Sequence, residues 1–169
     1  MGGRGGSSGL SQTKINSELE KIRNARRENL RVFDSAGNLV YSEGGTSSHT
    51  GYEAVDYTDK IAAHNHPKGT YPFPSDTDFD SYQRNNAKEM IIVSSDYTVR
   101  LRKDPTYKNL VRDSITNSMR WTNYNSNADQ ARRELKSGKI SRSEYIQRIF
   151  ELQKKAAKRA GYVLEGKRK

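Results

Sequence analysis

Two histidines and an aspartate near the middle of the 169-residue chain have the types and the spacing of metal ligands. His64 and His66 are separated by one residue, and Asp78 follows after a short connecting segment. On an extended segment, residues i and i+2 point to the same side, so the two imidazoles can converge on one ion. Two nitrogens and one carboxylate oxygen leave a fourth position for water, which is the arrangement of a catalytic zinc site. The spacing therefore predicts a Zn²⁺ site made of His64, His66 and Asp78.

The residues between the histidines and the aspartate predict how the chain brings these ligands together. Pro67 ends the extended segment and turns the chain, and Ser75 followed by Asp76 is typical of a helix start. Ser75 precedes Asp78 by one helical turn, so its hydroxyl is a candidate donor to an oxyanion formed during hydrolysis. A hydrolase also needs a base that takes a proton from water and passes it to the leaving group.

The string HNHPKGTYPFPSDTD, residues 64–78, resembles the signature of the JAMM/MPN metalloproteases, in which H-x-H-P is followed by a short loop and S-x-x-D. The stretches RENLRVFDSAGNLVY and EMIIVSSDYTVRLRK are similar to the first hairpin and to the later strand pair of this family. The resemblance covers roughly residues 14–105. It implies a small curved mixed β-sheet flanked by helices, with a JAB/MPN, cytidine-deaminase-like core. It also implies zinc-dependent cleavage of peptide or isopeptide bonds, with Glu28 as the general acid and base and Ser75 as the oxyanion donor.

The catalytic glutamate has alternatives, because no spacing rule fixes its position. Glu28 matches the family's glutamate at the start of the first hairpin, and Glu43 and Glu53 are the other candidates. Both alternatives lie in segments rich in Gly, Ser and Thr, where surface carboxylates are common. His49 lies in the same region between Ser and Thr, so we expect an exposed side chain and not a ligand.

Hydrophobic periodicity predicts the elements that must position these residues. Ile15, Leu19 and Ile22 recur at spacings of four and three, which indicates an amphipathic helix over 14–27. Further expected elements are a hairpin around 34–38, a buried strand over 60–64, a helix from 75 to 85, strands over 89–96 and 97–103, a helix after Pro105 with Leu110, Val111, Ile115 and Met119 on one face, and helices over 128–136 and 141–160. This order of strands and helices predicts an α+β or α/β fold that ends in a helical hairpin.

Composition divides the chain into three predicted parts. Residues 1–13 are rich in Gly and Ser and predict a flexible leader, residues 14–125 the metallohydrolase domain, and residues 126–169 a basic helical tail. Residues 131–169 contain 13 basic and 4 acidic residues, whereas residues 28–103 contain 8 basic and 11 acidic residues. The positive charge therefore belongs to the tail, which argues against a nucleic-acid-binding core.

The basic tail supports a second hypothesis about function. The chain could be a catalytically silent MPN-like scaffold that binds a protein partner or an acidic surface through residues 126–169, with nucleic acid less favoured. The DNA-repair-associated RadC proteins share the motif, so the fold by itself does not establish proteolysis. There is no cysteine and no apolar run long enough to span a bilayer, so we expect no membrane association and a cytoplasmic location. The opening MGGRGGSSG resembles the leaders of phage structural-cluster proteins, which would make this the cytoplasm of a bacterial host.

Overall fold

The computed structural model describes residues 6–45, 55–109 and 111–169, with side chains from residue 9 onward. The strands within these ranges are β1 (Asn29–Phe33), β2 (Leu39–Gly44), β3 (Ile61–Asn65), β4 (Glu89–Val93), β5 (Tyr97–Lys103) and β6 (Tyr162–Arg168). The helices are α1 (Gly6–Ile22), α2 (Asp76–Asn85), α3 (Ile115–Trp121), α4 (Tyr124–Lys136) and α5 (Arg142–Arg159).

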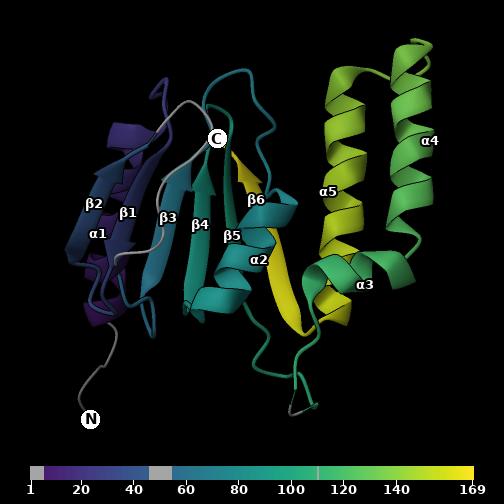
Figure 1. The fold of residues 1–169 in the computed structure, drawn as a ribbon. Coiled ribbons are helices and arrows are strands. Elements are labelled where there is room, and N and C mark those ends of the chain that lie inside the picture. The colour runs from purple at the N-terminus through teal and green to yellow at the C-terminus, as the bar shows by residue number, and fades with distance from the viewer. Residues whose placement is uncertain (1–5, 46–54, 110) are drawn as a thin grey trace.

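The strands form one curved, open, mixed sheet in the order β2-β1-β3-β4-β5-β6 (Figure 1). Only β3 and β4 pair in parallel among the described strands, because α2 connects them as a crossover and returns the chain to the same end of the sheet. The other neighbours are antiparallel. The predicted mixed sheet flanked by helices is confirmed at this level.

Helices cover both faces of the sheet (Figure 1). On one face, α1 buries Ile15, Leu19 and Ile22 against β-strand residues such as Phe33 and Ile91. The opposite face carries the larger core, to which α2, α3 and α5 contribute. His64 belongs to this second face, because it pairs with Leu30, a residue of the larger core. The histidines predicted as ligands therefore face α2, the helix that carries Asp78.

The predicted flexible leader is wrong for residues 6–13, which form the first turns of α1. Side-chain hydrogen bonds along the helix support these turns, from Gln12 to Asn16 at 2.7 Å and from Thr13 to the carbonyl of Gly9 at 2.9 Å. Lys14 also donates to Asn38 in the β1–β2 turn at 2.8 Å. Composition registers the low helix propensity of Gly and Ser, but not these hydrogen bonds. At its other end α1 stops at Ile22, earlier than the predicted residue 27.

The segment after Pro105 also differs from the prediction. The first helix begins only at Ile115, where the hydroxyl of Ser114 accepts from the backbone N–H of Asn117 as an N-cap. Val111 is 82% exposed and does not share a buried face with Ile115, and residue 110 lies outside the described residues. A strong capping residue therefore overrides the apolar spacing that suggested an earlier start.

The predicted division at residue 126 does not separate two structural units. Residue 126 lies inside α4, and α4 and α5 form the expected helical hairpin. The chain then continues as β6, which pairs with β5 along seven residue pairs, and Leu164 is buried in the main core. Gly161 allows this turn, since its φ is +90° and a Cβ there would lie 2.6 Å from the ring of Tyr107. The prediction of a basic helical tail is therefore wrong for residues 162–168.

No helix in the described ranges is long and apolar enough to span a lipid bilayer.

Candidate metal centre

The end of β3 places both histidines on one side of the sheet. His64 lies within β3, and the backbone N–H of His66 still donates to the carbonyl of Val93 at 2.9 Å, so the pairing with β4 continues past the strand. The two side chains point to the same face, and Asn65 points to the other. His64 is 2% exposed and His66 is 8% exposed, so both imidazoles lie in the protein interior.

The first turn of α2 holds Asp78 in a fixed orientation. Ser75 is the N-cap and Asp78 is the third residue of the helix, and together they form a capping box. Asp78 Oδ2 accepts hydrogen bonds from the backbone N–H and from the hydroxyl of Ser75, both at 2.7 Å. The other oxygen, Oδ1, points to His64 Nε2 at 3.1 Å. The S-x-x-D spacing is therefore a cap that aims one carboxylate oxygen at the histidines.

The three side chains converge with the dimensions of a metal site. His64 Nε2 and His66 Nε2 are 3.1 Å apart, and His66 Nε2 lies 3.5 Å from Asp78 Oδ2. In a tetrahedral zinc site with metal–ligand distances of about 2.0–2.1 Å, neighbouring ligand atoms lie roughly 3.3 Å apart. The predicted ligands are brought together as a buried group of potential metal ligands. One ligand atom from each residue lies within 4.8 Å of the others, so the three residues could hold a metal ion.

A hydrogen bond sets which nitrogen His66 presents to the cluster. Its Nδ1 lies 2.8 Å from the carbonyl oxygen of Tyr71, and only a protonated Nδ1 can donate to that oxygen. In the neutral imidazole, Nε2 then carries the lone pair and is available to a metal. This pairing of a ligand histidine with a backbone carbonyl is common in metal sites.

The electrostatics of the cluster couple the carboxylate to the imidazoles. Burial opposes charge on His66, but the hydrogen bond and the charge of Asp78 raise the pKa of His66 above its ordinary value. Burial also opposes charge on Asp78 and so raises the pKa of its carboxyl, but the neighbouring imidazoles outweigh this effect and hold that pKa well below the usual range. Asp78 therefore stays ionised, and the imidazole of His66 keeps its extra proton until the pH exceeds its raised pKa.

Glu28 directly precedes β1, in which Leu30 is opposite His64 of β3. The charge of Glu28 also contributes to the raised pKa of His66. Glu43 lies one strand farther away, opposite Leu30, and its carboxylate accepts from the Tyr41 hydroxyl at 2.9 Å. His49 and Glu53 lie outside the described residues.

Asn65, which the sequence analysis did not single out, ties the segment around Glu28 to β3. It is fully buried, and its Oδ1 accepts from the backbone N–H of Asn29 at 2.8 Å. Its Nδ2 donates to the carbonyl of Arg27 at 3.0 Å. These two bonds hold the residues on either side of Glu28. The only signal in the sequence was a polar residue placed between two ligands and facing the other side.

Helix α5 holds the loop between His66 and Ser75, which the sequence analysis also missed. Gln153, 2% exposed, donates to the carbonyl of Pro74 at 2.7 Å, directly before the cap of α2. Arg142 donates to the carbonyl of Gly69 at 3.3 Å. The helical hairpin therefore supports the loop near both of its ends and helps to place Asp78.

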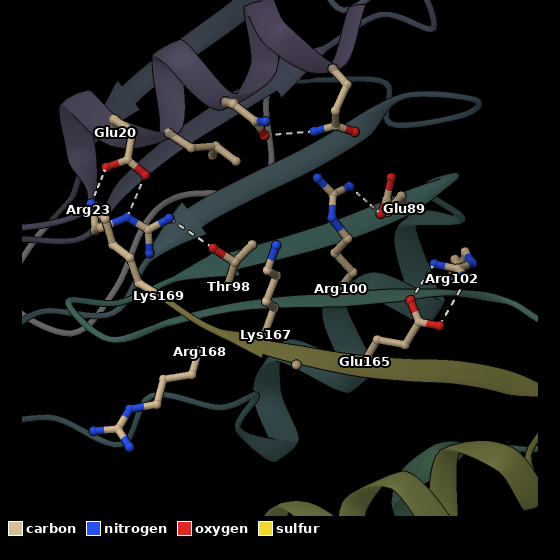
Figure 2. Close-up of a pocket in the computed structure, with 14 residues that line it drawn as sticks. Glu20, Arg23, Glu89, Thr98, Arg100, Arg102, Glu165, Lys167, Arg168 and Lys169 are labelled. Carbon is tan, nitrogen blue, oxygen red and sulfur yellow. Dashed lines mark hydrogen bonds and ion pairs between the residues drawn. The ribbon is translucent and has the colours of Figure 1, made fainter. Parts of the chain in front are cut away.

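A groove of about 950 Å³ lies on the opposite face of the sheet, between α1 and β4–β6 (Figure 2). Six Lys or Arg residues and three Glu residues line it, and ion pairs such as Arg100–Glu89 and Arg102–Glu165 cross its floor. Lys167 extends into the groove, beside Thr98 (Figure 2). The groove is separated from His64 and His66 by the sheet, so it is not the cleft of the metal centre.

Comparison of the chain with protein-family models, with curated proteins and with solved structures finds no match in any of the three. The likeness to the JAMM signature therefore rests on the sequence alone.

Proposed function

We propose that this chain is a zinc-dependent hydrolase of peptide or isopeptide bonds, with a site of JAMM/MPN type. One observation carries the proposal: His64, His66 and Asp78 are buried together, each offers one potential ligand atom within 4.8 Å of the others, and the charge of Glu28 acts on His66. Hydrogen bonds from Ser75 to Asp78 and from His66 to Tyr71 orient two of the ligands, as expected of a preorganised metal centre. We also propose that the protein is located in the cytoplasm, which would be that of a bacterial host if the chain is phage-encoded.

The residues of the site divide the work of hydrolysis. Bound zinc supplies a positive charge that polarises a carbonyl and lowers the pKa of coordinated water. Glu28 would take one proton from the attacking water as the C–O bond forms to give a tetrahedral oxyanion, and would then deliver this proton to the leaving nitrogen, so that the C–N bond breaks and the carboxylate of Glu28 is regenerated. The Ser75 hydroxyl donates to Asp78 in this structure, so acting as an oxyanion donor requires it to leave that bond. In the proposed reaction, the hydroxyl of Ser75 leaves Asp78 and donates to the oxyanion.

Cleavage of a peptide mixture tests the proposed function. Zinc-loaded protein is incubated with a diverse peptide library, and new termini are identified by mass spectrometry. We expect wild type to cut and Glu28→Gln to keep its zinc while losing about 10²–10⁴-fold in rate, because the proton transfer is lost. Glu43→Gln is the matched control and should retain activity, since Glu43 is bound to Tyr41. The same assay is run with a library of isopeptide-linked substrates. If zinc-loaded wild type produces new termini from neither library, the proposal is overturned.

The charged groove supports a second candidate function, the docking of an acidic protein partner. Its lining residues sum to a net charge of +3, and Glu20 and Glu165 are each paired with a cation. Binding of a polyglutamate peptide, measured by fluorescence anisotropy at several salt concentrations, tests this function. Lys167→Glu with Arg168→Glu should weaken binding, whereas Lys155→Glu on α5 should not. Equal binding by both variants would remove this candidate, and tighter binding of duplex DNA would replace the protein partner by nucleic acid.

A further inference from the structure

A cavity of about 530 Å³ lies between the loop that follows His66 and the α4–α5 hairpin. Tyr71 from the loop forms one wall, and Leu135, Arg142, Tyr145 and Ile146 from the hairpin form the rest. A cavity of this size falls within the range of sites that bind small ligands or side chains, about 300–1,000 Å³. Figure 1 shows the connection from β3 to α2 on the side of the sheet that carries α5, and Arg142 of α5 donates to the carbonyl of Gly69 in this connection.

Tyr71 joins this cavity to the metal centre. Its carbonyl oxygen is 2.8 Å from His66 Nδ1, while its side chain lines the cavity. The ring of Tyr71 also packs edge-on against Phe73, with centroids 5.5 Å apart, which holds the side chain in place. One wall of the cavity is therefore formed by the residue whose carbonyl oxygen contacts a proposed zinc ligand.

The lining of the cavity defines the chemistry of what it can hold. Leu135 and Ile146 are aliphatic, Tyr71 and Tyr145 are aromatic, and no carboxylate lines the wall among the described residues. Leu135, Tyr145 and Tyr71 also pack against a small apolar cluster of the hairpin, so the wall is anchored. Arg142 is the one charged lining residue, and part of its guanidinium is engaged by Gly69. An apolar body suits this space, and a basic side chain does not.

We propose that this cavity is a substrate subsite that accepts a large apolar side chain, aliphatic or aromatic, near the bond cut at the metal centre. The inference rests on the proposed hydrolase function and adds a substrate class to it. It also assigns the α4–α5 hairpin a role in specificity, in place of the appended tail suggested by its composition. A basic residue at the corresponding substrate position would bury a charge against the apolar wall. A very small residue would leave the cavity poorly filled.

Cleavage-site profiling of the peptide library tests the subsite. We expect Leu, Met, Phe or Tyr to be favoured over Gly and Lys at one fixed position from the cut bond, by at least about 10-fold. Ile146→Trp fills the cavity and should move this preference toward small residues, while zinc content stays constant. Gln147→Trp is the matched control, because it adds the same ring to the neighbouring exposed position of α5 and should leave the preference unchanged.

The outcomes separate this inference from the proposed function. Cleavage with no apolar preference, or with a preference that Ile146→Trp leaves unchanged, overturns the subsite and leaves the hydrolase in place. If no peptide is cut, binding to metal-free protein decides. N-acetyl-phenylalaninamide should then shift the NMR signals of Tyr145 and Leu135, two lining residues, saturably in wild type and not in Ile146→Trp. The same shifts with N-acetyl-glycinamide, or none with either probe, overturn the subsite.

Discussion

At the scale of single residues, the candidate site combines two local rules of chain geometry. The H-x-H spacing on a strand brings two imidazoles to one face, and the S-x-x-D spacing at a helix start makes a cap whose aspartate lies beside both histidines. Both rules are local, so His64, His66, Ser75 and Asp78 could be predicted from the sequence. The contacts of Asn65 could not, because they depend on a segment that lies more than 35 positions earlier in the chain.

Replacing Ser75 with alanine separates its capping role from its role at the metal centre. Loss of the cap should cost about 1 kcal/mol of stability. Loss of the bond that orients Asp78 should lower zinc affinity by about 10–100-fold. Competition with a chromophoric chelator measures the affinity. Ser141→Ala is the matched control, because Ser141 caps α5 by bonding to Glu144 and not to a proposed ligand, so it should lose similar stability and keep its zinc affinity. Equal zinc affinities in the two variants would contradict the orienting role.

Zinc affinity should depend on pH through His66. The raised pKa of His66 means that the protonated imidazole stabilises the metal-free protein fully below the unfolded pKa of about 6.5, and that this contribution is lost as the pH rises through the folded pKa. Zinc needs the neutral imidazole, so its apparent affinity should rise as the pH rises through the raised pKa of His66 and then level off. Asp78, with a lowered pKa, should not titrate in this window. Calorimetric titration at several pH values measures the trend, and a flat profile would rule out proton competition at His66.

At the scale of elements, the structure places the helical hairpin against the loop that carries the site. The capping boxes that begin α2 and α5 and the apolar period of α1 are local signals, and they led to correct elements at these positions. The contact between α5 and the loop is not local, because Gln153 and Pro74 are 79 positions apart. No pattern in a single sequence indicates such a long-range contact, so the sequence alone predicts that the hairpin is an appendage.

Substitution of Gln153 by leucine tests this support. The carbonyl of Pro74 would lose its hydrogen-bond donor inside the protein, so stability should fall by about 1–3 kcal/mol. The cap of α2 follows Pro74 directly, and zinc affinity should therefore fall as well. Urea unfolding with a parallel zinc titration measures both effects. Gln147→Leu changes an exposed glutamine on the same helix and should alter neither, and unchanged zinc affinity in Gln153→Leu would show that α5 does not help to place Asp78.

At the scale of the whole molecule, α5 and β6 belong to the same fold as the metal centre. The mixture of strands and helices could be predicted from hydrophobic periodicity, but the last strand could not. Residues 165–168 are exposed and mostly charged, so they lack the apolar pattern of a central strand. The backbone pairing with β5 and the burial of Tyr162 and Leu164 decide the structure of this segment.

Removal of residues 162–169 should therefore prevent folding and not release a free domain. The deletion would remove β6 from one side of β5 and expose Val99 and Leu101, which are buried on the core face. Circular dichroism and thermal unfolding measure the result, and we expect loss of the cooperative transition. A truncated protein that unfolds cooperatively, with unchanged zinc affinity, would show that β6 is dispensable.

The most direct test of the metal centre is the zinc content and coordination of the purified protein. Metal analysis with X-ray absorption at the zinc edge should find one zinc per chain, with two imidazoles and one carboxylate among its ligands. The double variant His64→Ala/His66→Ala should bind no zinc at this site, and Asp80→Asn, which changes an exposed carboxylate on α2, should bind as wild type does. Equal zinc content in wild type and in the double histidine variant would contradict the assignment.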